Sequence, residues 1–311
     1  MTLKEGYQYG IQLLEEAGVQ EARLDAWILL EEATQVTRAT YYADSDITIT
    51  KEAKKQYMQW LDKRAMRIPL QHILGYQEFM GLRFLVTPAV LIPRQDTETL
   101  VEYTETLLQD KAKAETEAKP KTEVNVKPKA EVNVKPNAKT EVKAKAKVLD
   151  MCTGSGCIII SLMKRNAELV GSAVDISHAA LEVARENAKQ LGVKVDFVQS
   201  DLFEGVQGTY EVIVSNPPYI KEDEILQLEK EVQNFDPFVA LSGGKDGLKF
   251  YQIIVDESRA HLVQGGSLVL EIGAEQARDV SEMMRLRGFE EVQVFQDLTG
   301  LDRIVHGVYN K

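Results

Sequence analysis

Apolar side chains recur every three or four positions along the first 65 residues of the chain. The row formed by Leu3, Tyr7, Ile11 and Leu14 is the first example. This spacing is typical of amphipathic helices that bury one face. We therefore expect residues 1–70 to form a small all-helical domain. A domain of this size is too small to be an obvious enzyme by itself, which favours a docking or stabilising role.

The pattern changes to short runs of apolar and β-branched residues over positions 72–92, interrupted by glycine and proline. Such interrupted runs are typical of a β-hairpin or of short strands. A helix is expected to follow over residues 97–109. Residues 71–109 are therefore predicted to be a connector made of a hairpin and a helix.

Beyond residue 147, strand-like and helix-like stretches alternate along the chain. Strands are expected at 147–151, 173–175, 193–198, 211–214, 267–272, 291–295 and 303–308. Helices are expected at 157–165, at 177–191 with Ser177 as the N-cap, at 247–262 and at 275–287. This alternation predicts an α/β fold over residues 148–311, with a doubly wound, mostly parallel sheet and helices on both faces. Ligands of such sheets bind at the C-terminal ends of the strands, where the strand order reverses.

Residues 110–147 differ in composition from the rest of the chain. The dipeptide Lys-Pro recurs there with an eight-residue period, and Gly, Leu, Ile, Met and aromatic residues are missing. The segment contains 11 Lys and 6 acidic residues, so it carries a net charge of +5 and leaves −16 for the other residues. Because it has too little apolar surface to offset the entropy of ordering, we expect it to be disordered or a fraying helix. We interpret it as a low-complexity insert between two domains.

The composition narrows the class of protein. A net charge of −11 argues against a general binder of nucleic acid or of acidic membranes, which normally carries a basic excess. Two cysteines exclude a disulfide scaffold and a four-cysteine zinc site, and they fit a reducing cytoplasm. The polar start of the chain is unlike a signal peptide. The four histidines are scattered without metal-ligand spacing, so no metal site is expected.

The first strand of the α/β domain leads into a glycine-containing loop, Cys152-Thr153-Gly154-Ser155-Gly156. Two glycines allow a tight turn and a close approach of the backbone to a ligand. Position 159 is Ile, so the dinucleotide-binding pattern G-x-G-x-x-G fails, and no phosphate-binding P-loop occurs.

Acidic residues follow the next two strands. Asp175 ends the second strand, where an acid accepts hydrogen bonds from ribose hydroxyls in doubly wound folds. Asp201 with Leu202 ends the third strand and is placed to reach an adenine amino group. Together with the glycine loop, these residues predict a ligand that carries adenosine but no polyphosphate.

The sequence Asn216-Pro217-Pro218-Tyr219 directly follows the fourth strand. Its two prolines fix the backbone and remove two N–H donors. The Asn216 side-chain oxygen and the Pro217 carbonyl remain as acceptors, which suit the two donors of a planar –NH2 group. Tyr219 offers a flat face to an amide or a base.

Asn-Pro-Pro-Tyr in this position resembles class I methyltransferases that use S-adenosylmethionine (SAM) and act on planar nitrogen. Further segments resemble one branch, the peptide chain release factor glutamine N5-methyltransferase family. These segments include Gly75-Tyr76, Leu91-Ile92-Pro93-Arg94, Thr153-Gly154-Ser155-Gly156, Glu271-Ile272-Gly273 and Asp302-Arg303. The resemblance covers nearly the whole chain except the insert. It departs from the family pattern at Gln95, Asp96 and Cys152, where the family usually has Pro, Glu and Gly.

The resemblance implies an enzyme that methylates the glutamine of the Gly-Gly-Gln loop of bacterial class-1 release factors. We expect it to be a cytoplasmic monomer. The resemblance also implies SAM as cofactor and S-adenosylhomocysteine as product. The expected substrate-binding residues are Asn216, Pro217, Pro218 and Tyr219. The expected cofactor-binding residues are Cys152, Thr153, Gly154, Ser155, Gly156, Asp175, Asp201, Leu202 and Asn216. No stable nucleic-acid or membrane partner is implied.

Three other functions stay open at this stage. A DNA or RNA amino-methyltransferase uses the same Asn-Pro-Pro-Tyr turn, although the net charge of −16 outside the insert opposes duplex binding. A methyltransferase acting on a ribosomal-protein glutamine has a similar core. A non-enzymatic binder of release factors is disfavoured by the intact Asn216–Tyr219 motif.

Overall fold

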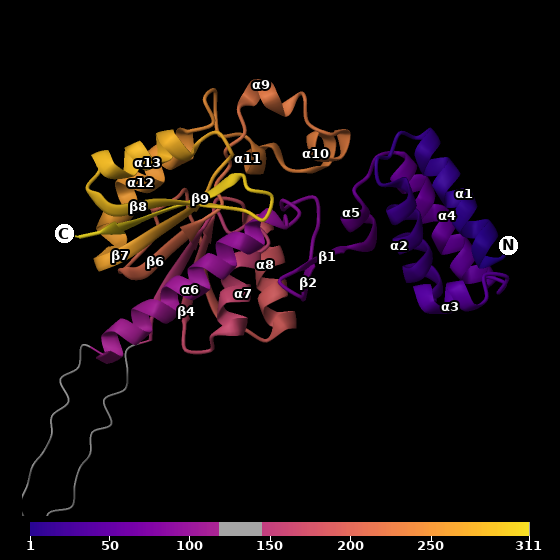
Figure 1. Cartoon of the computed structure of the whole chain (residues 1–311), viewed down its shortest axis with the longest axis horizontal. Coiled ribbons are helices and arrows are strands. Elements are labelled where there is room, and N and C mark those ends of the chain that lie inside the picture. Colours follow the sequence, from indigo (N-terminus) through magenta and orange to yellow (C-terminus); the bar gives the residue numbers. More distant parts are fainter. Residues whose placement is uncertain (118–144, 311) are drawn as a thin grey trace, which may run out of the picture. The chain divides into compact units, whose positions relative to one another are not determined.

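The computed structural model describes residues 1–117 and 145–310 (Figure 1). Most of the segment for which we expect disorder, residues 118–144, lies outside the described residues. At the start of that segment, residues 110–117 continue helix α6 (Asp96–Glu117). Ala, Lys and Glu dominate there, and all three are good helix formers, so the helix does not stop at residue 109.

The described residues divide into two compact units, and each contains two stretches of chain. Unit 1 consists of residues 1–93 and 218–249, and unit 2 consists of residues 94–217 and 250–311. The sequence motif Asn216–Tyr219 is thus shared, because the chain passes from unit 2 to unit 1 between Pro217 and Pro218.

Unit 1 begins with the predicted helices. They are α1 (Leu3–Glu16), α2 (Ala22–Thr34), α3 (Arg38–Ala43) and α4 (Lys51–Ala65). Thr2 and Glu5 form a capping box at the start of α1. Leu14, Leu29, Tyr57 and Leu61 are fully buried in the core that these helices enclose.

A tight contact joins α1, α2 and α4. The Tyr57 hydroxyl lies 3.2 Å from the carbonyl oxygens of Gly6 and Ala26 and donates toward both. A Cβ at Gly10 would lie 2.1 Å from the Tyr57 hydroxyl oxygen. Glycine at position 10 therefore makes room for the buried tyrosine between the helices.

The rest of unit 1 consists of short elements. They are α5 (Leu70–Leu74), β1 (Tyr76–Phe79), β2 (Leu82–Leu85), α9 (Glu222–Ile225), α10 (Lys230–Phe235) and α11 (Phe238–Leu241). Strands β1 and β2 pair in the antiparallel sense and confirm the predicted hairpin. The helices α9 to α11 were not predicted, because segments this short carry too little periodicity to indicate a helix.

A buried ion-pair network ties α10 to the helical core of unit 1. Arg64 donates from Nε to Asp25 at 2.6 Å and from Nη2 to Glu231 at 2.8 Å. Arg67 donates from Nε to the same Glu231 carboxylate at 2.7 Å. Burial acts to raise the pKa of Glu231, but the hydrogen bonds from Arg67 and Arg64 outweigh it and hold the pKa at about 2. The network fixes a segment that follows Tyr219 closely in the sequence.

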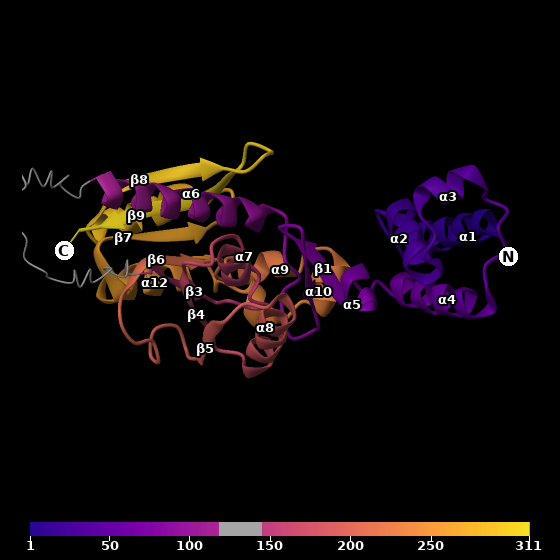
Figure 2. The ribbon, with the colours of Figure 1, turned by 90° about the horizontal axis from the view of Figure 1, so that it is seen from below.

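Unit 2 contains a seven-stranded sheet in the order β5-β4-β3-β6-β7-β9-β8. The strands are β3 (Lys147–Met151), β4 (Val170–Asp175), β5 (Val195–Gln199), β6 (Tyr210–Ser215), β7 (Leu262–Glu271), β8 (Phe289–Gln296) and β9 (Asp302–Tyr309). Only β9 runs against the others, since it pairs in the antiparallel sense with both β7 and β8. Figure 2 shows the strands side by side, with α6 along β7 and β9.

Helices cover both faces of this sheet. Figure 1 shows α6, α7 (Cys157–Arg165) and α8 (His178–Leu191) on one face, with α12 (Lys249–His261) and α13 (Ala277–Leu286) on the other. The predicted α/β class with a doubly wound, mostly parallel sheet is confirmed. The main difference is at β7, which begins at Leu262, directly after α12, rather than at Ser267.

The strand order reverses between β3 and β6. The last residues of these two strands, Met151 and Ser215, are partners in the parallel register. The Ser215 hydroxyl also donates to the Met151 carbonyl at 2.6 Å. The loops that start at Cys152 and at Asn216 therefore leave the sheet from adjacent positions at the point where doubly wound sheets bind ligands.

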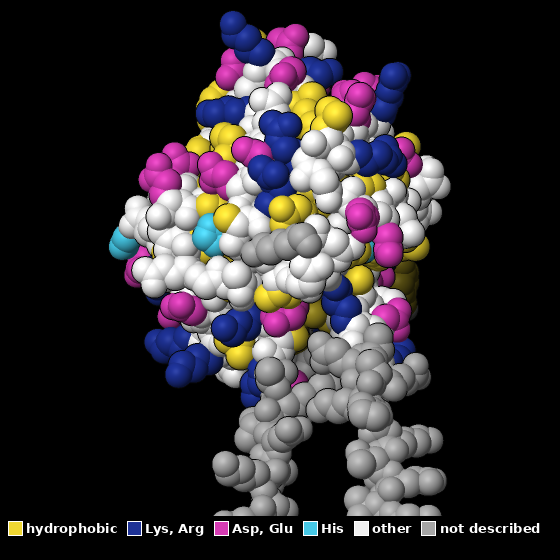
Figure 3. Space-filling view, turned by 90° about the vertical axis from the view of Figure 1, so that its left-hand side faces the viewer, with side chains coloured by type: hydrophobic (Ala, Val, Ile, Leu, Met, Phe, Trp, Pro, Cys, Tyr) yellow, Lys and Arg dark blue, Asp and Glu magenta, His cyan; other side chains and the backbone are white. Residues whose placement is uncertain are grey.

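Figure 3 shows one face of the molecule, on which acidic and basic side chains are interspersed with polar and apolar ones. The acidic excess of the sequence is therefore not gathered on that face. Among the described residues, no helix combines the length and the apolar character that a bilayer crossing requires.

Candidate active site

The loop after β3 has an unusual backbone. Cys152, Gly154 and Gly156 all have positive φ, at 61°, 55° and 80°. Gly156 caps α7, and a Cβ there would lie 2.8 Å from the Ile160 side chain. A Cβ at Gly154 would meet no heavy atom within 4 Å, so this stretch of backbone is open to a ligand. Cys152 occupies a conformation that favours glycine, the usual residue in the family pattern.

The Cys152 thiol is half-buried. Burial raises its pKa above the ordinary value of a thiol, and the nearby Asp175 and Asp150 carboxylates act in the same direction. A thiol that stays protonated is a poor nucleophile. Cys152 therefore contributes backbone geometry rather than reactivity.

The Asp150 side chain at the end of β3 fixes the glycine loop by hydrogen bonds. Its carboxylate is completely buried and accepts from the Thr153 hydroxyl at 2.6 Å and from the Ile159 N–H at 3.4 Å. Burial raises the pKa of Asp150 to about 7 despite these hydrogen bonds. Asp150 ties the turn to the start of α7, a role that spacing alone did not predict.

Asp175 connects the ends of β3 and β4. Its Oδ2 accepts from the Gly154 N–H at 2.8 Å, and its Oδ1 accepts from the Ser177 N–H at 2.9 Å. Burial raises the pKa of Asp175, and the backbone hydrogen bonds oppose that rise. The fold thus brings Asp175 next to the glycine loop, although 21 residues separate Gly154 and Asp175 in sequence.

Asp201 and Leu202 follow β5, the neighbour of β4. The Ser200 N–H donates to the Asp175 carbonyl at 3.1 Å, which holds the start of this loop beside Asp175. Asp201 is exposed, whereas Leu202 is buried and has a positive φ of 45°. The predicted residues from three successive strands therefore gather at one edge of the sheet.

Asn216 follows β6 at the same edge. Its side-chain nitrogen Nδ2 lies 3.1 Å from the Thr97 hydroxyl oxygen and donates to it. Thr97 belongs to α6 and is buried. Burial raises the pKa of the Glu271 carboxyl, at the last residue of β7, to about 7, and the nearby side chains of Thr97 and Asn216 act to lower it. Neither Glu271 nor Thr97 was assigned a role in the site from the sequence, because nothing in their spacing links them to Asn216.

Pro218 and Tyr219, the second half of the Asn216–Tyr219 motif, belong to unit 1. The residue after Tyr219, Ile220, donates its N–H to the Leu241 carbonyl at 3.0 Å and accepts from the Gly243 N–H at 2.8 Å. A Cβ at Gly243 would lie 2.8 Å from the Tyr219 Cα. Glycine at position 243 therefore lets the following loop lie directly against the tyrosine.

A second ion-pair cluster lies at the start of α6 and β9. Arg303 donates from Nη2 to Asp297 at 3.0 Å and lies 3.1 Å from Asp96 Oδ2. Asp96 is one of the positions that depart from the family pattern, and its shorter side chain still reaches the guanidinium. The Arg303 charge also acts to lower the pKa of Glu271, whereas Asp96 acts to raise it.

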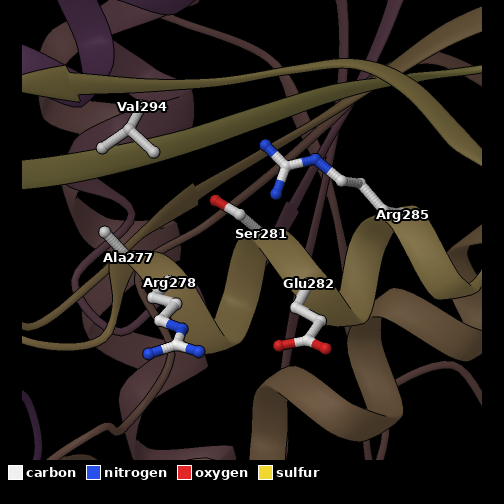
Figure 4. Close-up of a pocket in the computed structure, with 6 residues that line it drawn as sticks. All are labelled: Ala277, Arg278, Ser281, Glu282, Arg285 and Val294. Carbon is white, nitrogen blue, oxygen red and sulfur yellow. The ribbon is translucent and has the colours of Figure 1, made fainter.

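A separate surface pocket of about 490 Å³ lies between α13 and the edge strand β8. Its lining residues are Ala277, Arg278, Ser281, Glu282, Arg285 and Val294. Figure 4 shows Arg278, Ser281, Glu282 and Arg285 projecting from α13, with Val294 on the strand. None of the predicted site residues lines this pocket, and its charged side chains are exposed. The edge formed by the ends of β3 to β7 is therefore the better candidate for chemistry.

Comparisons with known proteins agree with this geometry. A family model described as the PrmC N-terminal domain matches residues 5–75, and the methyltransferase small domain matches residues 137–235. The hMettl16 catalytic domain, solved in complex with a MAT2A 3'UTR hairpin, superposes with a TM-score of 0.53 at 12% identity. The superposition covers 92% of this chain and 91% of the hMettl16 chain. At 12% identity, the similarity shows the fold alone.

Two relatives match over almost their full length. The release factor glutamine methyltransferase of Geobacter sulfurreducens is 38% identical, covering 94% of this chain and 92% of its own. That of Koribacter versatilis is 34% identical, covering 99% of this chain and 98% of its own.

The fold and the edge site define a class I SAM-dependent methyltransferase. Within that class, the chain belongs to the release factor glutamine methyltransferase family, since the relatives exceed 30% identity over nearly the whole chain.

The cofactor of this class is SAM, and the residues at the sheet edge fit it. The open side of Gly154 leaves space for the cofactor to approach the backbone. Asp175 and the exposed Asp201 supply acceptors for hydroxyl and amino groups. SAM supplies a methyl group on a sulfonium, which is already activated for transfer.

Proposed function

We propose that this protein methylates the side-chain amide nitrogen, N5, of the glutamine in the Gly-Gly-Gln motif of class-1 peptide chain release factors. The observation that carries the proposal is the position of Asn216. Asn216 begins the loop after β6, next to the loop that begins at Cys152, where the strand order reverses. Its Nδ2 donates a hydrogen bond to the Thr97 hydroxyl. The names of the relatives support the choice of substrate.

The substrate nitrogen is a poor nucleophile because its lone pair is delocalised into the amide. We propose that the Asn216 Oδ1 and the Pro217 carbonyl accept the two N–H bonds of that amide. This orientation points the nitrogen lone pair at the methyl carbon and supports proton loss as positive charge develops. A new N–C bond forms, the S–C bond breaks, and the amide proton leaves to solvent. Tyr219, with Pro218 before it, packs on the flat amide.

The cofactor-binding role falls to the loops after β3, β4 and β5. In our proposal, Cys152, Thr153, Gly154, Ser155 and Gly156 form the backbone cradle for the methionine part of SAM. Asp175 holds the ribose hydroxyls, and Asp201 with Leu202 contacts the adenine. Asn216 lies where cofactor and substrate meet. The hydrogen bond from the Gly154 N–H to the Asp175 carboxylate supports this arrangement, because it keeps the glycine loop and Asp175 next to each other.

The helical domain of residues 1–70 is proposed to dock the release factor, and the enzyme is proposed to act as a cytoplasmic monomer. Residues 71–109 connect the helical domain to the insert, and residues 148–311 form the methyltransferase domain. The family model that matches residues 5–75 supports a dedicated N-terminal module.

One assay tests the proposed substrate. The full-length protein is incubated with methyl-labelled SAM and, in separate reactions, a release factor, its Gly-Gly-Gln Gln→Ala variant, ribosomal protein and DNA. We expect label on the release factor and none on the Gln→Ala variant. Label on ribosomal protein or DNA in place of the release factor overturns the proposal.

A further inference from the structure

We propose that Glu271 is a positioning residue that, together with Thr97, fixes the side-chain amide of Asn216 in the orientation that accepts the substrate. The inference rests on the proposed function, since it assumes that Asn216 binds the substrate amide. It adds two residues, from α6 and β7, to a site that the sequence placed only on the loops after β3 to β6.

The backbone brings the three residues together. Ser215 and Leu270 are partners in the parallel register of β6 and β7, so Asn216 and Glu271 follow them side by side. The Glu271 backbone is held on both sides. Its carbonyl accepts from the Tyr251 hydroxyl at 2.9 Å, and the next residue, Ile272, donates to the Arg303 carbonyl at 2.9 Å.

The hydrogen bonds determine which way the Asn216 amide points. Thr97 and Asn216 both act on the Glu271 carboxyl, which in its ionised form is an acceptor only. In the proposed arrangement, the ionised carboxylate accepts the Thr97 hydroxyl hydrogen and faces one N–H of Asn216. The Thr97 oxygen then accepts the second N–H of Asn216, at 3.1 Å. Both hydrogens of the Asn216 amide are thus directed toward Glu271 and Thr97. The Oδ1 atom is left on the opposite side, free to accept from a substrate.

The alternative orientation is blocked by the same groups. If the amide turned over while Glu271 is ionised, Oδ1 would face a carboxylate that only accepts, and the Nδ2 donors would face the substrate donors. Thr97 cannot compensate while its hydrogen is given to Glu271. The network therefore selects one of two orientations that have almost the same shape.

Packing alone does not account for an acid at position 271. The Glu271 residue is only 1% exposed, and among the described residues its Oε2 meets no hydrogen-bond donor. Such a group is costly to bury. The nearest charges work against each other, because Arg303 favours the ionised form and Asp96 disfavours it. In the proposed arrangement, the acid at position 271 acts on the Asn216 amide.

The test uses variants that keep the shape of each side chain. Thr97→Val removes the hydroxyl, Thr97→Ser keeps it, and Glu271→Gln replaces the carboxylate. Thr104→Val is the matched control, because Thr104 is also buried on α6 and its hydroxyl only donates to the Leu100 carbonyl. For each full-length variant, kcat and KM for a release factor are measured, with S-adenosylhomocysteine affinity by calorimetry and Tm by calorimetric melting.

We expect Thr97→Val and Glu271→Gln to lower kcat about 10- to 100-fold, since a positioning group supports one that is worth roughly 10²–10³-fold. KM and S-adenosylhomocysteine affinity should stay close to those of the wild type in both variants. Tm should stay close to the wild-type value in Thr97→Val and should not fall in Glu271→Gln. Thr97→Ser should recover most of the rate, and Thr104→Val should be unchanged. Adding Thr97→Val to Asn216→Ala should cause no further loss, because both act through the same amide.

The outcomes separate the two proposals. If Asn216→Ala is inactive while Thr97→Val and Glu271→Gln keep wild-type kcat, the positioning role is wrong and the proposed function stands. If Asn216→Ala itself keeps its activity, the proposed function fails first. A loss that Thr104→Val shares, or that Thr97→Ser does not repair, identifies general damage to α6 and also overturns the positioning role.

Discussion

The backbone N–H of Gly154 donates to Oδ2 of Asp175 at 2.8 Å, so the glycine loop after β3 and the acid at the end of β4 form one rigid corner. Asp175 also accepts from the Ser177 N–H at the start of α8. A single carboxylate thus shapes the loop and, in the proposed complex, holds the ribose. Its removal should affect cofactor binding before it affects the chemical step.

Asp175→Ala is expected to weaken S-adenosylhomocysteine binding about 10- to 100-fold, the loss typical of a hydrogen bond to a charged group. Isothermal titration calorimetry measures this directly. Asp196→Ala is the control, because Asp196 is an exposed acid on the neighbouring strand β5. Equal affinity in wild type and Asp175→Ala would show that Asp175 does not contact the cofactor.

Asn216→Ala is expected to lower kcat for release-factor methylation roughly 10²–10³-fold, because the substrate amide loses a positioned acceptor. Cofactor affinity should change much less, since the cradle after β3 is intact. Initial rates with saturating SAM provide the measurement. Asn166→Ala, at the end of α7, serves as the matched control. Retention of most of the wild-type kcat would rule out the proposed mechanism.

Glu271→Gln should stabilise the fold at alkaline pH while it slows catalysis. Burial raises the pKa of Glu271 to about 7, so the folded state holds a proton that the unfolded state releases near pH 4.5. Stability is therefore greatest below pH 4.5 and is lost as pH rises to about 7. Above pH 7, the variant lacks this penalty and is expected to gain on the order of 1–3 kcal/mol.

Urea unfolding at pH 4 and pH 8 tests that sign. The two proteins should be similar in free energy of unfolding at pH 4 and should diverge at pH 8. Asp150, whose pKa is also raised to about 7, is present in both proteins and cancels in the comparison. A variant that is less stable than the wild type at pH 8 contradicts the prediction and indicates a structural role for the carboxylate.

Gly10→Ala is expected to destabilise the helical core of unit 1 by about 1–3 kcal/mol, the range for overpacking a tight core. The new Cβ would lie 2.1 Å from the Tyr57 hydroxyl oxygen and 3.1 Å from the Ala26 Cβ, and Tyr57 is fully buried. The double variant Gly10→Ala/Tyr57→Phe should recover part of the loss by removing the clashing oxygen. Chemical denaturation monitored by circular dichroism measures both. No loss in Gly10→Ala would mean that the helices separate without cost.

The sequence alone predicted the features that depend on local pattern. The alternation of strands and helices indicated the doubly wound sheet, because periodicity reports which face of each element is buried. The Gly154–Gly156 turn, Asp175 and Asn216 were found because each directly follows an apolar strand, and parallel strands end at the same edge. The helices α9 to α11 were missed because they are too short to show a periodic pattern. Long-range contacts, such as the hydrogen bond from Arg64 to Glu231 in α10, stabilise them instead.

Only the tertiary structure could join Thr97 and Glu271 to Asn216. Thr97 is 119 residues from Asn216 in sequence, and no spacing rule connects a threonine at the start of a helix with an asparagine after a strand. The connection arises because α6 packs along β7 and because β6 and β7 end in register. Hydrogen bonds act over about 3 Å of space, so long-range packing decides which partners the Asn216 amide has. The sequence thus determined where the substrate amide is expected to bind, and the fold decided which way Asn216 faces it.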